Sequence, residues 1–92
     1  MIGEYSMAQK IRQDLSIGDN IRRLRRQSGL TQEQVVTRLQ LRGIEISRSS
    51  YSQIECGTYN IRVSELVALA ELFGAHYDEF FKNLTEKPPG SS

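Results

Sequence analysis

Five side chains between residues 48 and 56 would share one face of a helix, because they fall together at 100° per residue. They are Arg48, Ser49, Ser52, Gln53 and Cys56. This face carries one positive charge and no carboxylate. Arginine, serine and glutamine donate hydrogen bonds to phosphates and base edges, and glutamine can bind adenine through two of them. The pattern favours contact with a polyanion, although an ordinary polar surface helix would share it.

The opposite face of the same helix contains a charge that needs a partner. Tyr51, Ile54 and Glu55 lie at positions i, i+3 and i+4, which points them toward the core. A bare buried carboxylate is costly, so Glu55 should be paired. Arg25 lies four residues after Ile21, on the apolar stripe of an earlier helix. We predict an ion pair between Arg25 and Glu55 that fastens the two helices together; the alternative is that both side chains reach water separately.

That earlier helix is expected over residues 17–28. Ser16 is the predicted N-cap, with Asp19 three residues later, and Gly29 follows the last turn. Three further arginines are expected on its outer side, where they either contact phosphates or keep the domain soluble: Arg22, Arg23 and Arg26.

The second helix begins at the strongest local signal in the chain. Thr31 and Gln34 form a capping-box pattern, and Leu30 and Val35 form the matching hydrophobic staple. Gly43 is expected to end this helix. Residues 43–46 then form a connector with two apolar anchors, Ile44 and Ile46.

The third helix is expected over residues 48–56, with Ser47 as N-cap and Gly57 at its end. Two helices joined by a short glycine-containing connector, the second one short and polar outside, form the plan of a helix-turn-helix. A fourth helix is predicted over residues 63–73 and a last turn or two over 77–84. The aromatic residues of that last segment belong either to the core or to a dimer surface: Tyr77, Phe80 and Phe81.

The 92 residues are enough for one domain. We expect a flexible arm over 1–15, the folded domain over 16–84 and a disordered tail over 85–92. Residues 10–62 contain ten Lys or Arg and five Asp or Glu, whereas residues 63–92 contain two and five. One basic region beside an acidic one is typical of a domain with a single nucleic-acid face.

Composition also bears on other classes of protein. No stretch is long and apolar enough to span a membrane, and the N-terminus lacks a secretory signal, so we expect a cytoplasmic protein. One cysteine and one histidine cannot build a zinc site alone, and no nucleophile–base pair or phosphate loop is evident. We therefore expect no metal, no cofactor, no small-molecule ligand and no enzymatic activity.

Three segments together resemble the phage Cro/repressor (lambda repressor-like) helix-turn-helix family. The first holds Ile17, Gly18, Ile21, Arg22, Leu24 and Arg25; the second runs from Gly29 to Val35, and the third from Ile46 to Gly57. Residues 66–74 and 78–81 resemble the family's fourth and fifth helices. The resemblance covers about residues 17–81 and implies an all-α, five-helix domain that binds double-stranded DNA and regulates transcription, as a repressor.

The resemblance also implies roles for single residues. Arg48, Ser49 and Gln53 match base-reading positions, with Ser52 nearby. Gln32 matches a residue that contacts the phosphate backbone and braces the recognition helix. Arg25 and Glu55 match an internal ion pair. The loop after the recognition helix matches a phosphate-holding segment, which here includes Thr58, Tyr59, Asn60 and Arg62.

One departure from the family lies in the connector. The segment from Gln40 to Ile46 is longer than is usual there, so either the second helix gains a turn or the connector bulges. Because one module offers few base contacts, we expect a homodimer on a two-fold DNA site. The alternative function is a protein-interaction module of the same fold, such as an antitoxin or co-regulator.

Overall fold

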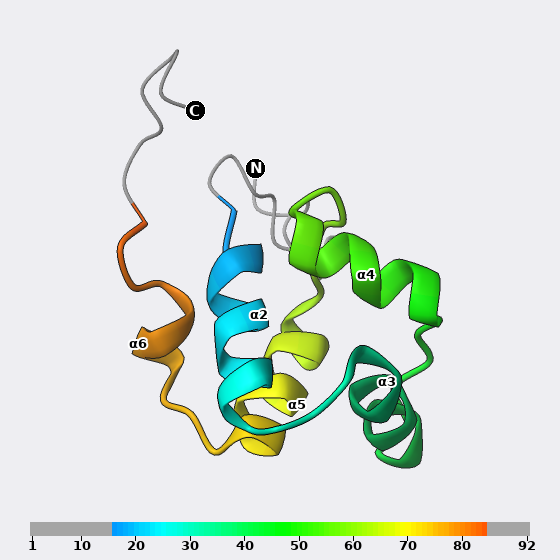
Figure 1. The fold of residues 1–92 in the computed structure, drawn as a ribbon. Helices are drawn as coiled ribbons and strands as arrows, with labels where there is room; N and C mark the ends of the chain where they lie inside the picture. The colour runs from blue at the N-terminus through cyan, green and yellow to red at the C-terminus, as the bar shows by residue number, and fades with distance from the viewer. Residues whose placement is uncertain (1–15, 85–92) are drawn as a thin grey trace, which may run out of the picture.

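The computed structural model describes residues 16–84, and its elements are five helices (Figure 1). They are α2 (Gly18–Gln27), α3 (Gln32–Leu41), α4 (Arg48–Cys56), α5 (Val63–Phe73) and α6 (Tyr77–Phe80). The all-α, five-helix fold expected from the sequence is therefore confirmed. The predicted arm over 1–15 and tail over 85–92 lie outside the described residues. Within residues 16–84, every helix is too short or too polar to cross a bilayer.

Every helix contributes to one hydrophobic core. Ile21 of α2, Leu39 of α3, Ile54 of α4, Leu69 of α5 and Phe80 of α6 are each at most 1% exposed. They belong to a single cluster of buried side chains. Figure 1 shows α2 between α6 on one side and α4 and α3 on the other, with α5 near the lower end of α2 in this view. Helices this short are marginal alone, so their stability comes from this shared core.

The start of α2 differs from the prediction by one residue. The N-cap is Ile17, not Ser16, and Asp19 forms no capping bond. Ile17 is 3% exposed, so its side chain is committed to the core. Ser16 still serves the helix end, because its hydroxyl accepts a hydrogen bond from the Gly18 N–H at 3.0 Å. Burial of Ile17 in the core therefore accounts for an N-cap one residue later than the local sequence suggested.

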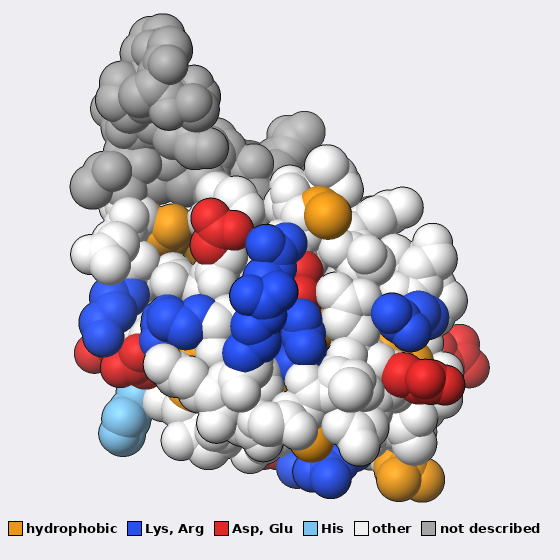
Figure 2. Space-filling view, in the orientation of Figure 1, with side chains coloured by type: hydrophobic (Ala, Val, Ile, Leu, Met, Phe, Trp, Pro, Cys, Tyr) orange, Lys and Arg blue, Asp and Glu red, His pale blue; other side chains and the backbone are white. Residues whose placement is uncertain are grey.

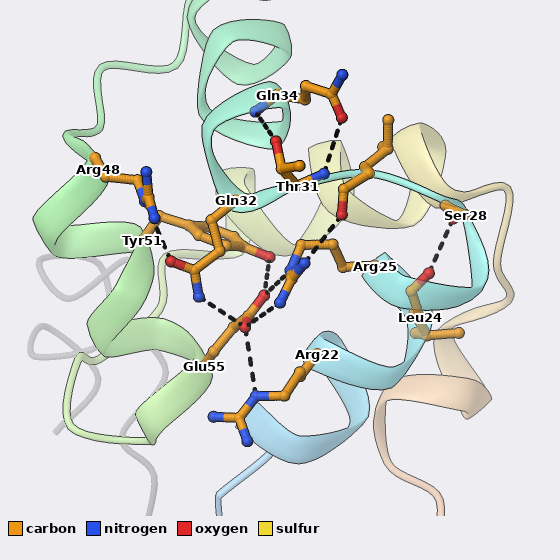
Figure 3. Close-up of polar contacts among 11 residues, drawn as sticks. Arg22, Leu24, Arg25, Ser28, Thr31, Gln32, Gln34, Arg48, Tyr51 and Glu55 are labelled. Carbon is orange, nitrogen blue, oxygen red and sulfur yellow. Dashed lines mark hydrogen bonds and ion pairs between the residues drawn. The ribbon is translucent and has the colours of Figure 1, made fainter.

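The predicted capping box at the start of α3 is confirmed (Figure 3). The Gln34 N–H donates to Thr31 Oγ1 at 3.1 Å, and the Thr31 N–H donates to Gln34 Oε1 at 2.9 Å. These two bonds satisfy backbone donors that a helix start leaves without partners.

The connector after α3 bulges rather than extending the helix by a turn. α3 ends at Leu41, and Gly43 adopts a left-handed φ of 87°. The Ile44 N–H then reaches back to the Leu39 carbonyl at 3.0 Å, as in a Schellman motif. Gln40 Nε2 donates to the Ile46 carbonyl at 3.1 Å, which ties the far end of the connector to the helix. Both predicted apolar anchors pack on the core, Ile46 fully and Ile44 in part.

α4 begins and ends where the sequence predicts. Ser47 Oγ accepts a hydrogen bond from the Ser50 N–H at 3.0 Å, and Gly57 ends the helix with a φ of 82°. The side chains of Tyr51, Ile54 and Glu55 are buried, as the helical wheel indicates.

The last helix, α6, is shorter than the predicted 77–84. Phe80 is fully buried, whereas Tyr77 and Phe81 are 49% and 46% exposed, so only Phe80 is core. Asn20 of α2 holds this end of the chain, because its Nδ2 donates to the carbonyls of Phe80 and Lys82, each at 2.9 Å.

Candidate nucleic-acid interface

Glu55 lies at the centre of a hydrogen-bonded cluster that joins α2, α3 and α4 (Figure 3). Its side chain is 1% exposed. Arg25 donates to both carboxylate oxygens, through Nε at 2.6 Å and Nη2 at 3.1 Å. The Tyr51 hydroxyl donates at 2.6 Å and Gln32 Nε2 at 3.0 Å. The predicted Arg25–Glu55 ion pair is therefore present, within a larger network that includes Tyr51 and the expected brace, Gln32.

The network controls the protonation of its members. Burial disfavours the charged form of Glu55, but hydrogen bonds from Arg25, Tyr51 and Gln32 outweigh burial and lower its pKa. The hydrogen bond to Glu55 raises the pKa of Arg25 against the opposing effect of burial. Burial and the hydrogen bond to Glu55 together raise the pKa of Tyr51. The cluster is thus an ionised pair with a neutral tyrosine at neutral pH.

Arg25 also fastens the turn that leads into α3. Its Nη1 donates to the Leu30 carbonyl at 2.9 Å. Because the same guanidinium holds Glu55, the start of α3 and the back of α4 are positioned by one side chain.

The backbones of α2 and α4 also approach each other closely, at Gly18. A Cβ on Gly18 would overlap the Glu55 carbonyl oxygen and lie 2.7 Å from that of Ile54. Real Cβ atoms essentially never approach backbone oxygen so closely. The helices therefore meet at a distance that only glycine permits.

The outer face of α4 is open and contains no carboxylate. Arg48, Ser49, Gln53 and Cys56 are exposed, and Ser52 is half-buried. Glu55, the one acidic residue of α4, is buried in the cluster beside this face. The structure therefore brings the four expected base-reading residues, Arg48, Ser49, Ser52 and Gln53, to one side of one helix.

Arg48 is held at one edge of this face by Gln32. Its Nε donates to Gln32 Oε1 at 3.2 Å, while Gln32 Nε2 donates to Glu55. The Gln32 side chain thus braces α4 from α3, and both ends of its amide are occupied. Its contact with a phosphate stays a prediction.

The three other arginines of α2 do not share one environment, contrary to the expectation that all lie on its outer side. Arg22 is half-buried and forms an ion pair with Glu55, Nε to Oε1 at 3.5 Å. Arg23 faces α6, where Nη1 lies 3.4 Å from Glu79 Oε1 and Nη2 donates to the Glu79 carbonyl at 3.1 Å. Arg26 is exposed.

The loop after α4 is organised by a residue that the sequence analysis missed. Glu65, 1% exposed, accepts hydrogen bonds from the Arg62 N–H at 2.8 Å and the Tyr59 hydroxyl at 3.1 Å. Burial, together with the charge of Glu65, raises the pKa of Tyr59. An acid at the third position of a predicted helix is the signal that could have revealed it.

The side chains of Thr58, Asn60 and Arg62 remain exposed in this loop. The Thr58 N–H is already bonded to the Gln53 carbonyl at 3.0 Å. Arg62 lines a hollow with Tyr59, Ser50 and the connector between α3 and α4. Ser50 is two residues from Arg48, so it lies on the other edge of α4. The expected backbone-contacting residues are therefore split, with Gln32 on one edge of α4 and the loop on the other.

Positive charge gathers where α2 meets α4. Figure 2 shows Lys and Arg side chains in a band across the face on which these helices lie in Figure 1, with acidic side chains beside it at several places. Residues 16–84 contain no cluster of three His, Cys, Asp or Glu side chains that could hold a metal ion.

Comparisons with known proteins bear on the fold and the family. The family model of a helix-turn-helix domain matches residues 16–80. A crystal structure of the restriction-modification controller protein C.AhdI from Aeromonas hydrophila is similar, with a TM-score of 0.60 and 28% sequence identity. The match covers 71% of this chain and 91% of that one. A search of curated proteins found no match.

Proposed function

Because the chain belongs to the helix-turn-helix domain family through residues 16–80, we propose that it binds double-stranded DNA and regulates transcription. In this proposal α4 enters the major groove, whose width accepts a helix. Similarity to a protein described as a restriction-modification controller supports the regulatory role.

The observation that carries the proposal is the carboxylate-free outer face of α4, held from behind by Glu55. A helix that approaches phosphates gains from having no acid on its outer side. Here the one acid of α4 is instead used to anchor the helix to α2 and α3. A rigid recognition helix does not have to be ordered when DNA binds, which lowers the cost of binding.

The two edges of α4 would contact the two walls of the groove. The start of α3, with Gln32, lies at one edge, and the loop with Thr58, Asn60 and Arg62 lies at the other. Contacts of this kind position the protein on the duplex but carry no sequence information. Tyr59, bonded to Glu65, would keep the loop in shape.

The residues of the outer face would read the bases. Gln32 occupies Arg48 Nε, so the two terminal nitrogens of that guanidinium remain for O6 and N7 of a guanine. Gln53 suits an adenine, which it can bind through both ends of its amide. Ser49 and Ser52 would add single hydrogen bonds.

Three or four readers specify only a short half-site, so we propose that the protein acts as a homodimer on a two-fold operator. The half-sites would then be centred about 34–36 Å apart, one helical turn of DNA. Tyr77 and Phe81 offer exposed aromatic surface for the dimer, since they are about half exposed while Phe80 is buried.

Selection of bound duplexes from a random pool tests the proposal directly. We expect a recovered palindrome whose half-sites contain guanine and adenine contacts. Placing that sequence across a promoter should lower reporter expression, as expected of a repressor. Complete absence of salt-sensitive binding to any duplex would instead favour a module that binds a protein partner.

A further inference from the structure

We propose that Arg22 of α2 is a phosphate-binding residue of the DNA interface, held in place by Glu55. The inference rests on the proposed function and adds a contact to the same site. It begins from the difference between Arg22 and its neighbour Arg23, which carry the same charge on the same helix but pair with different elements, Arg22 with Glu55 of α4 and Arg23 with Glu79 of α6.

The spacing of α2 places Arg22 at the junction with α4. Gly18, Arg22 and Arg25 lie at i, i+4 and i+7, along one stripe of the helix. Gly18 touches the backbone of Glu55, and Arg25 binds the Glu55 carboxylate. Arg22 lies between them, and its Nε reaches Glu55 Oε1 at 3.5 Å.

Glu55 does not need Arg22. Its two oxygens already accept four hydrogen bonds, two from Arg25 and one each from Tyr51 and Gln32. A carboxylate offers about four such positions. The charge of Glu55 is neutralised by Arg25, so Arg22 adds a positive charge that the cluster does not balance.

The free end of Arg22 is available to an anion. The side chain is 37% exposed and makes no hydrogen bond within residues 16–84. Asp19, one turn earlier on α2, forms no ion pair with it among these residues. Figure 3 shows the terminal nitrogens of Arg22 directed away from the carboxylate, on the side of the cluster where α4 lies. A guanidinium held through Nε can present both terminal nitrogens to a phosphate.

The matched control is Arg23. It is 33% exposed and lies 3.4 Å from Glu79, close to the 37% and 3.5 Å of Arg22 with Glu55. Its partner, however, belongs to α6 and not to α4. Replacing either residue with glutamine removes one charge and one ion pair. Arg23→Gln also removes hydrogen bonds to Asn20 and to the Glu79 carbonyl, so it is the harsher control for loss of stability, while the charge it removes faces α6 and not α4.

The experiment measures the affinity of the wild type, Arg22→Gln, Arg23→Gln and Arg22→Lys for duplex DNA between 50 and 200 mM salt. Both a random-sequence duplex and the selected operator are used. Each neutralised phosphate contributes about −0.9 to the slope of log affinity against log salt. Raising the salt from 50 to 200 mM should therefore decrease the affinity of Arg22→Gln by a factor that is roughly three- to four-fold smaller than the factor for the wild type. The difference should be the same on both duplexes. Arg23→Gln should keep the wild-type slope, and Arg22→Lys should keep it too, because a phosphate accepts a point charge.

A purely structural role for Arg22 would look different. Arg22→Gln would then lower the melting temperature and the affinity at every salt concentration while the slope stayed at the wild-type value, which would overturn the inference. An equal decrease of the slope in Arg23→Gln would overturn it as well. If the wild type itself showed no salt-dependent binding, the proposed DNA function would fail first, so the two failures are distinguishable.

Discussion

The α-carbon of Gly18 lies so close to the carbonyl of Glu55 that a methyl group has no room between them. Gly18→Ala should therefore push α2 away from α4, because the obstacle is backbone and cannot rotate aside. We expect a loss of about 1–3 kcal/mol in the free energy of unfolding, the usual range for overpacking. This loss would occur although alanine is the better helix former.

Urea denaturation measures the effect of Gly18→Ala, with Gln27→Ala as control in an exposed position of the same helix. The control should change stability by less than about 0.5 kcal/mol. A stabilised Gly18→Ala protein would mean that the two helices are not in close contact.

Removing the guanidinium of Arg25 should destabilise the domain strongly. Arg25→Ala removes the cation that binds both oxygens of the buried Glu55 and leaves only the longer contact with Arg22, at 3.5 Å. Breaking a buried pair in this way typically costs about 3–5 kcal/mol. Arg26→Ala removes the same charge from an exposed position and should be nearly neutral. Equal losses in the two variants, measured by urea denaturation, would contradict the inward ion pair.

Acid should weaken the domain partly through Glu55. Its pKa is lowered in the folded state, so its contribution to stability is present above the usual glutamate pKa of about 4.3. That contribution is lost as the pH falls through the lower, folded-state pKa. The wild type should therefore lose stability below about pH 4.5 more steeply than Glu55→Gln.

The measurement of acid sensitivity is urea denaturation at pH 7, 4.5 and 3. Glu45→Gln, in the exposed part of the connector, is the control and should follow the wild type. The same pH dependence in wild type and Glu55→Gln would exclude the low pKa.

Some of the contacts behind these stability predictions could be predicted from the sequence, and others could not. The Arg25–Glu55 pair and the Thr31 capping box follow from patterns within single helices. Glu65 could have been found by the same reasoning. By contrast, the contacts of Gly18 with α4 and of Asn20 with α6 depend on how distant segments pack, which periodicity does not report.

The expected ends of two helices were wrong where packing in the core decided them. The N-cap moved from Ser16 to Ile17 because Ile17 is buried. The last helix ends after Phe80 rather than at residue 84, and Asn83 turns the chain with a φ of 59°. The Lys82 carbonyl thereby meets Asn20, a tertiary contact that favours the turn over another helical one.

Gln53→Ala should affect recognition and not folding. We expect a loss of about 1–3 kcal/mol on the selected operator and a relaxed preference at one base pair. The measurement is a binding profile against operators changed one position at a time, with Gln27→Ala as the control outside α4. A uniform loss on every sequence would mean that Gln53 is not a reader.

Arg48 and Gln32 should change the same base preference to different degrees. Arg48→Ala should remove a preference for guanine, and Arg48→Lys should reduce it, because lysine lacks the planar paired donors of the guanidinium. Gln32→Ala leaves Arg48 in place without its partner, so the same preference should weaken but survive. The same profile checks both, and a Gln32→Ala profile identical to the wild type would show that Gln32 does not orient Arg48.

The hydrogen bonds of α4 also divide its outer residues by how freely they could be exchanged. The side chains of Ser49 and Gln53 form no hydrogen bond within residues 16–84, whereas Arg48 is connected through Gln32 to the buried cluster. Libraries that randomise Ser49 and Gln53 should therefore yield folded proteins with altered operator preference. Libraries at Arg48 would also remove its hydrogen bond to Gln32, so redesign of specificity should begin at the other two positions.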